Sequence, residues 1–143
     1  MFALPDKRAH ALATLLATYD RVAIVGGPRT GKTTLSERVN AELKDDRFVL
    51  HNDDLLKSFD WTSAPFGIIE RLAPYTRFVV EGVQTARALR KGLKVDAVIY
   101  LDDPKVLRNK GQVSMAKGIA TVFAEWRAAH PFVPLVHPDR GLY

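Results

Sequence analysis

The sequence predicts an α/β fold in which helices cover both faces of a parallel sheet. Four short runs of β-branched and other apolar residues occur along the chain, and turn-forming or acidic residues follow each run. Stretches with helical periodicity separate these runs, as parallel strands require, because a crossover must connect their distant ends. With 143 residues the chain has room for one core, so we expect a single domain over residues 1–143.

The predicted elements alternate along the chain. The first helix follows Pro5 and places Ala9 and Leu12 on one side, at helical spacing. A fifth strand at residues 132–136 contains Pro134, and proline cannot donate to a ladder, so we expect four or five strands. The four other strands are expected at residues 21–25, 48–50, 78–80 and 97–101. Helices are expected at residues 6–18, 32–43, 54–59, 66–72, 84–89 and 113–129.

Composition limits the environment and the partners of the chain. The formal net charge is +5 and the isoelectric point is about 9.6, which favours DNA or phosphorylated small molecules as partners but is equally typical of a solvated basic surface. No apolar run is long enough to cross a bilayer, and Pro5 and nearby charges interrupt the stretch that a signal peptide would need. Cysteine is absent, which suits a reducing compartment. We therefore expect a cytoplasmic protein without a membrane partner.

The strongest motif lies at residues 26–33, which match the pattern G-x-x-x-x-G-K-[ST] between a predicted strand and a predicted helix. Glycines let successive backbone amides face inward, and the start of the helix adds its positive dipole end. We expect Lys32 to reach the β- and γ-phosphates of ATP or GTP and the Thr33 hydroxyl to ligate Mg²⁺. The residues expected to bind the nucleotide are Gly26, Gly27, Pro28, Arg29, Thr30, Gly31, Lys32, Thr33 and Thr34.

Two other interpretations of this loop are weaker. A glycine-rich turn that merely begins a helix does not need the lysine and the hydroxyl that follow Gly31. A dinucleotide-binding loop needs the spacing G-x-G-x-x-G, whereas residue 28 is proline.

Acidic residues follow the second, third and fourth predicted strands, where ligands of parallel α/β sheets bind. Together with the phosphate loop, His51-Asn52-Asp53-Asp54 and Val79-Val80-Glu81-Gly82 resemble the small nucleoside and nucleotide kinases, and the uridine-kinase-like proteins most closely. This resemblance implies a three-layer P-loop sandwich with strand order 2-3-1-4-5. It also implies that an acid after the second strand accepts the proton of the acceptor hydroxyl, and that Glu81 holds Mg²⁺ or its waters.

Asp53 is the position to which the resemblance assigns the base, with Asp54 as the second candidate. The alternative for this pair is a helix N-cap before Leu55. Glu81 ends an apolar strand, where an unpaired carboxylate would be costly, so we expect a metal or a lysine as its partner.

Small kinases of this group usually carry an arginine-rich lid, and here that segment is short. Its candidate catalytic residue is Arg108, and exposed helix charges are the alternative interpretation for it and for the other basic residues nearby. Trp61 and Phe66 are expected either to stack on a base or to belong to the core. The histidines lack metal-binding spacing, and residues 102–104 read as a turn. The other basic residues considered are Lys110, Lys117, Arg87, Arg90 and Lys91.

These patterns favour a P-loop phosphotransferase that uses ATP and Mg²⁺. The expected acceptor is the hydroxyl of a nucleoside-like small molecule or, as in similar phage enzymes, of a hydroxymethylated base in DNA. The alternative function is an NTP-binding regulatory or interaction module, or an ATPase without transferase activity. Asp53 discriminates between them, since a binding module has no use for a base that faces an acceptor. The oligomeric state stays open.

Overall fold

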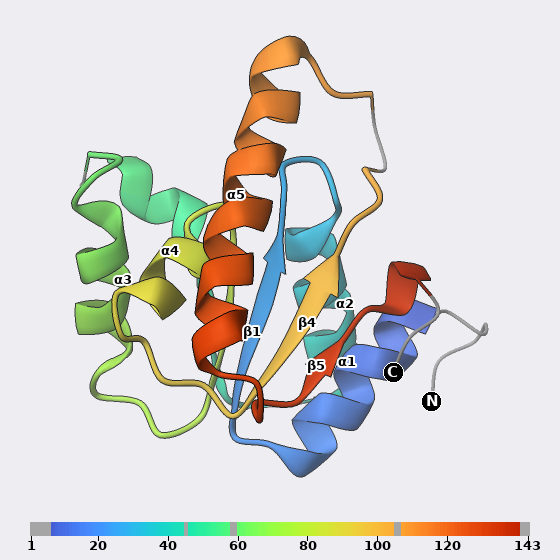
Figure 1. Cartoon of the computed structure of the whole chain (residues 1–143). Coiled ribbons are helices and arrows are strands. Elements are labelled where there is room, and N and C mark those ends of the chain that lie inside the picture. The colour runs from blue at the N-terminus through green and yellow to red at the C-terminus, as the bar shows by residue number, and fades with distance from the viewer. Residues whose placement is uncertain (1–6, 45, 58–59, 105–106, 141–143) are drawn as a thin grey trace.

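A computed structural model describes residues 7–44, 46–57, 60–104 and 107–140. Its centre is a five-stranded sheet in which every pair of neighbouring strands is parallel and the order is β2-β3-β1-β4-β5 (Figure 1). The predicted α/β class and the predicted strand order 2-3-1-4-5 are therefore confirmed. Because all strands run the same way, their carboxyl ends meet at one edge of the sheet, at the top of Figure 1.

The strands agree with the predicted runs except at the fifth. Residues 132–136 were expected to be extended, but Phe132 is 95% exposed and lies in the turn before the strand. Pro134 contributes only its carbonyl, which accepts a hydrogen bond from the Val98 amide at 2.9 Å, so the strand is short and lies at the edge. The strands are β1 (Arg21–Gly26), β2 (Phe48–His51), β3 (Phe78–Glu81), β4 (Ala97–Leu101) and β5 (Leu135–Val136).

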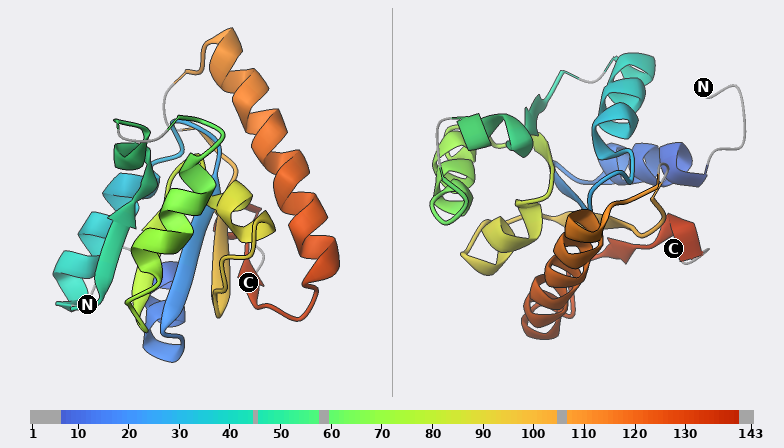
Figure 2. Two further views of the ribbon diagram at one scale, coloured as in Figure 1. Left: turned by 90° about the vertical axis from the view of Figure 1, so that its left-hand side faces the viewer. Right: turned by 90° about the horizontal axis from the view of Figure 1, so that it is seen from above.

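Helices cover both faces of the sheet, with α1 and α2 on one side and α3, α4 and α5 on the other (Figure 2). The segment after β2 is a 3-10 helix rather than an α-helix, and the predicted helix residues 6, 58 and 59 lie outside the described residues. Of the described helices, none has the length and apolar character needed to cross a bilayer. The helices are α1 (Lys7–Thr18), α2 (Lys32–Leu43), η1 (Asn52–Lys57), α3 (Ala64–Leu72), α4 (Thr85–Arg90), α5 (Lys110–Ala129) and η2 (Pro138–Arg140).

The α5 helix begins at Lys110, earlier than the expected residue 113. Its N-cap is Asn109, whose side chain accepts a hydrogen bond from the Gln112 amide at 2.8 Å. The Gln112 side chain in turn accepts from the Asn109 amide at 3.0 Å, which completes a capping box. These reciprocal bonds satisfy two amides that would otherwise lack partners, and they fix the start of α5 beside the phosphate loop.

Side-chain alternation along β1 divides the core into two layers. Val22 and Ile24 face α1 and α2, whereas Ala23 and Val25 face α3, α4 and α5, and all are fully buried. A strand buried on both faces reads as a continuous apolar run, and such a run is the signal that identifies β1 in the sequence. The central strand therefore anchors the loop that follows it.

Candidate functional site

The phosphate loop connects the end of β1 to the start of α2. Gly31 has φ = 83° and is the N-cap of α2, so the chain enters the helix through a left-handed conformation that glycine adopts without steric cost. Lys32 is the first residue of α2. Backbone amides at the first turn of a helix have no partner within the helix, and here they border the hollow beside the loop.

Lys32 folds back into this loop. Its Nζ donates hydrogen bonds to the Gly27 carbonyl at 2.7 Å and to the Thr30 Oγ1 at 3.2 Å. Burial is the largest influence on Lys32 and lowers its pKa, while the negative charges of Glu81 and Asp53 oppose that shift. The ammonium group thus lies within the electrostatic reach of both acids.

Glu81 is 1% exposed at the end of β3, and two side chains donate to its Oε2. The Thr33 hydroxyl donates at 2.6 Å, and the His51 Nδ1 lies 2.5 Å away. The expected partner was a metal or a lysine, and the hydrogen-bonding partners of the carboxylate in the structure are a threonine and a histidine. The spacing of the histidines in the sequence does not suggest a metal site, so it gave no reason to select His51. Its one sequence signal was its place at the end of a predicted strand, and the structure pairs it with Glu81 in the β2–β3 register.

The oxygens of Thr33 and Glu81 fit a magnesium site in which phosphate and water supply the remaining ligands. Mg²⁺ in nucleotide sites usually takes only one or two protein oxygens, and these two lie 2.6 Å apart beside the hollow. Within the described parts of the chain, no group of three or more His, Cys, Asp and Glu side chains forms a candidate metal cage. The donor set thus suits a cation that arrives with phosphates.

Replacing Glu81 by glutamine is expected to raise the Mg²⁺ concentration needed for half-maximal ATP-induced thermal stabilisation by about tenfold. The amide keeps the shape but loses the charge that faces the cation. Thermal unfolding at fixed ATP and varied Mg²⁺ measures this shift. Glu37→Gln is the matched control, because Glu37 is exposed and lies 3.5 Å from the other ring nitrogen of His51. An unchanged Mg²⁺ requirement in Glu81→Gln would remove Glu81 from the metal site.

Asp53 lies in the first turn of η1 and lines the same hollow as Lys32 and Glu81. Its side chain is exposed, and its Oδ1 accepts a hydrogen bond from the Val83 amide at 3.1 Å. The carboxylate therefore joins η1 to the loop after β3. Asp54 is also exposed but does not line the hollow.

Asn52 and Gly82 lock the carboxyl ends of β2 and β3 together. Asn52 is fully buried, and its Nδ2 donates to the Thr85 Oγ1 at 2.5 Å. Gly82 has φ = 136°, and a Cβ atom there would lie 1.7 Å from the Asn52 Oδ1. Only glycine fits at this position, so the short pattern after Glu81 has a packing reason that sequence reasoning missed.

Arg108 and the start of α5 cover the phosphate loop. The Arg108 Nε donates to the Pro28 carbonyl at 2.8 Å, and the Arg29 Nε donates to the Gln112 Oε1 at 3.2 Å. The structure thus brings Arg108 to the phosphate loop, and its role in catalysis stays a prediction. Lys110 and Lys117 are exposed on α5.

The hollow at the loop has a volume of about 310 Å³ and opens at the carboxyl ends of β1, β2 and β3. Every residue predicted to bind nucleotide between 28 and 34 lines it, except Thr30, which is buried behind the loop. The lining residues are Pro28, Arg29, Gly31, Lys32, Thr33, Thr34, Asp53, Glu81, Val83 and Gln112.

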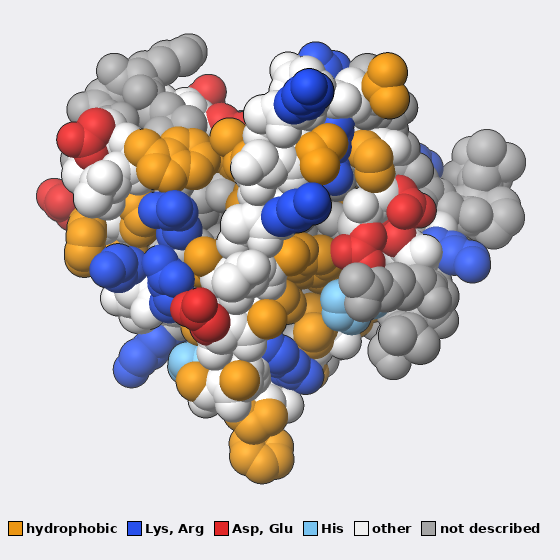
Figure 3. All heavy atoms as spheres, turned by 45° about the horizontal axis from the view of Figure 1, so that its top comes forward, with side chains coloured by type: hydrophobic (Ala, Val, Ile, Leu, Met, Phe, Trp, Pro, Cys, Tyr) orange, Lys and Arg blue, Asp and Glu red, His pale blue; other side chains and the backbone are white. Residues whose placement is uncertain are grey.

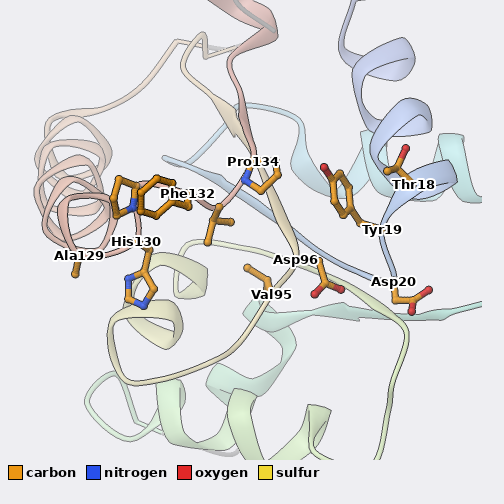
Figure 4. A pocket seen from close by; sticks show the side chains of 11 residues that line it. Thr18, Tyr19, Asp20, Val95, Asp96, Ala129, His130, Phe132 and Pro134 are labelled. Atoms are coloured by element: carbon orange, nitrogen blue, oxygen red, sulfur yellow. The ribbon is translucent and has the colours of Figure 1, made fainter.

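A larger hollow of about 700 Å³ lies at the opposite end of the sheet (Figure 4). Tyr19 and Asp96 stand on one side of it and His130 and Phe132 on the other. The Asp96 carboxylate is already engaged, because it accepts hydrogen bonds from the Arg21 amide and guanidinium. Ligands of parallel sheets bind at the carboxyl ends of strands, so the smaller hollow is the better candidate despite its volume.

Cations and aromatic rings pair on the face beside η1. The Arg87 guanidinium lies 5.3 Å from the centroid of the Trp61 ring, and the Lys91 Nζ lies 5.6 Å from that of Phe66. Phe66 is 55% exposed and so does not belong to the core, whereas Trp61 packs partly against it. Figure 3 shows Lys and Arg side chains beside exposed hydrophobic side chains on this face. Arg90 instead pairs with a glutamate of α5 at 3.1 Å.

Comparisons with known proteins add no family to this geometry. The chain matches no model of a protein family, and no curated protein matches it. A fold of this kind hosts many activities, so the side chains of the site, and not the fold, indicate the function.

Proposed function

We propose that this protein is an ATP-dependent kinase that transfers the γ-phosphate to a hydroxyl of a nucleoside-like acceptor. The observation that carries the proposal is the meeting of Lys32, Asp53 and Glu81 around one hollow at the phosphate loop. Phosphoryl transfer needs a cation for the phosphates, an acid that positions the metal and a base for the nucleophile. These three side chains supply one group of each kind.

In the proposed reaction, the acceptor oxygen forms a bond to the γ-phosphorus while the bond between that phosphorus and the bridging oxygen breaks. The hydroxyl proton passes to the Asp53 carboxylate, and ADP leaves with the electron pair of the broken bond. Lys32 and the loop amides stabilise the charge on the phosphates, and Arg108 acts from the α5 side. Bound Mg²⁺, held by Thr33 and Glu81 directly or through water, would neutralise phosphate charge.

The acceptor is either a small nucleoside-like molecule or a hydroxymethylated base in DNA. Two observations favour DNA: the net charge of +5 and the cation–aromatic pairs that Trp61 and Phe66 form beside η1. Cations bind the phosphodiester backbone, and exposed rings stack on bases. A nucleoside would use the same rings, so the two acceptors are separated by experiment.

The alternative is an NTP-binding module or an ATPase without transferase activity, which the short segment before α5 favours. The position of Asp53 argues against it. This carboxylate lines the phosphate hollow and accepts a hydrogen bond from the Val83 amide, so it reaches beyond its own helix turn.

Incubation with γ-labelled ATP and Mg²⁺ tests the proposal against separate pools of nucleosides, nucleotides, sugars and hydroxymethylated duplex DNA. We expect label to enter one pool and ADP formation to rise when that pool is supplied. Transfer to DNA should also weaken steeply with salt, because bound counterions are released on binding. Lys32→Met protein prepared in parallel reports any contaminating kinase. ADP formation that no pool increases would contradict the kinase and favour the ATPase or binding module.

A further inference from the structure

Arg8 is a buried arginine that contacts the phosphate loop from behind. It belongs to the first turn of α1 and is 8% exposed. Its Nη1 donates to the Thr30 carbonyl within the loop, and its Nη2 donates to the Asp103 carbonyl at 3.0 Å. A buried guanidinium lowers stability unless a negative group pairs with it, so Arg8 needs such a partner.

Asp139 of η2 pairs with this guanidinium through both of its oxygens, and Figure 1 shows η2 beside α1. The Nε–Oδ1 and Nη2–Oδ2 distances are both 2.6 Å. The Asp139 Oδ2 also accepts hydrogen bonds from the amides of Asp102 and Asp103, at 2.8 Å and 2.9 Å. Burial alone would raise the pKa of Asp139, but the bonds from Arg8 and these amides outweigh it and lower the pKa. The pair is therefore ionised at neutral pH.

The contact between Arg8 and the Thr30 carbonyl strengthens a hydrogen-bond donor that the loop presents to an anion. A guanidinium that donates to the Thr30 carbonyl polarises the peptide between Thr30 and Gly31, which makes the Gly31 amide a stronger donor. The Arg8 charge also reaches the interior of the loop. Burial is the largest cause that lowers the pKa of Lys32, and the positive charges of Arg108 and Arg8 lower it further.

We infer that Arg8 is a positioning residue and a further fixed cation of the phosphate site, which acts on phosphate through the peptide between Thr30 and Gly31. Asp139 holds this cation in place and ties it to the end of β4. The inference rests on the proposed role of the loop in binding phosphate. It goes beyond the loop motif, because neither Arg8 nor Asp139 belongs to that motif.

A second Arg–Asp pair provides a matched control at the other end of the sheet. Arg21 and Asp96 join the start of β1 to the segment before β4, with an Nη2–Oδ1 distance of 3.0 Å. The Asp96 Oδ2 also accepts a backbone amide, from Arg21, at 2.9 Å. Both pairs thus brace the sheet through similar bonds, but only the Arg8 pair contacts the phosphate loop.

The test measures the Kd of inorganic tripolyphosphate by calorimetry, without Mg²⁺, for wild type, Arg8→Gln, Arg8→Lys, Asp139→Asn and Arg21→Gln. Urea unfolding of the same proteins measures stability separately. We expect Arg8→Gln to weaken binding by about tenfold, the scale of one lost charged contact. Arg8→Lys keeps the charge but loses the fork of donors that reaches Thr30, so its affinity should fall between those of wild type and Arg8→Gln. Arg21→Gln should bind as wild type does, although it loses stability.

Asp139→Asn separates the effect of the Arg8 charge on binding from the effect of the Arg8–Asp139 ion pair on stability. This variant also tests the inference if Arg8→Gln fails to fold. It removes the negative charge but keeps a side-chain oxygen that can accept a hydrogen bond from Arg8, so the cation stays in place. Tripolyphosphate should therefore bind no more weakly than to wild type while stability falls. Binding by Arg8→Gln equal to wild type would overturn the inference alone. The inference would also be overturned if Arg21→Gln or Asp139→Asn lost affinity for tripolyphosphate in proportion to its loss of stability. An Arg8→Lys affinity as low as that of Arg8→Gln would overturn it as well. A wild-type protein that does not bind tripolyphosphate would overturn the phosphate loop itself.

Discussion

Replacing Lys32 by methionine is expected to abolish the stabilisation that ATP and Mg²⁺ give to the folded protein. At a ligand concentration of about a hundred times Kd, wild type should gain about 3 kcal/mol. For a chain of this size, that gain raises Tm by about 6 to 12 °C. Methionine keeps most of the buried aliphatic stem, but it removes the ammonium that we propose to bind the β- and γ-phosphates. Thermal unfolding with and without ATP measures the difference.

The matched control for Lys32→Met is Lys94→Met, which changes an exposed lysine before β4. This variant should keep the full ATP-induced rise in Tm, because its charge lies away from the loop. A rise in Lys32→Met equal to that in wild type would contradict the assignment of the phosphate loop, and the proposed function would fail with it.

Replacing Asp53 by asparagine is expected to slow phosphate transfer by about a hundredfold or more, the usual scale for loss of a general base. Asparagine has nearly the same shape, and its side-chain oxygen can still accept the bond from the Val83 amide. The ATP affinity should therefore stay close to that of wild type. Single-turnover transfer to the acceptor pool that takes the label measures the rate, and ATP-induced stabilisation reports binding.

Asp54→Asn is the control for this variant, because Asp54 is the neighbouring exposed carboxylate outside the hollow. We expect it to transfer phosphate at the wild-type rate. A slow Asp54→Asn beside a fast Asp53→Asn would move the base to Asp54. Wild-type rates in both variants would show that positioning alone drives transfer, and the residue-level mechanism would be wrong.

The sequence was sufficient for the fold because local signals and sheet topology agree. β1 is apolar after Arg21 and the phosphate loop follows it directly, so the central strand and its carboxyl end were both identifiable. β5 was harder to predict, because it has only two residues, follows Pro134 and is placed by its pairing with β4. Local propensity carries little information about such an edge strand.

The site was predictable only where a residue type itself carries chemistry. Lys32 belongs to the loop motif, and Asp53 and Glu81 are carboxylates that lie just after β2 and at the end of β3. His51 and Asn52 act through partners about thirty positions away, and Arg8 through Asp139 at the other end of the sequence. Such pairs become visible only when the sheet brings them together, because neither member has a local pattern that predicts the other.

The strand order predicts different mobility for the two segments that form the site, the phosphate loop after β1 and η1 after β2. β1 has hydrogen-bonded neighbours on both sides, β3 and β4, whereas β2 stands at an edge of the sheet and pairs with β3. Local opening is easiest where fewer neighbours hold the backbone. The loop after β1 should therefore move less than η1, which follows the edge strand and is tied to the segment after β3 by side-chain bonds of Asn52 and Asp53. Motions that admit an acceptor would then occur on the side of the base and leave the phosphate side undisturbed.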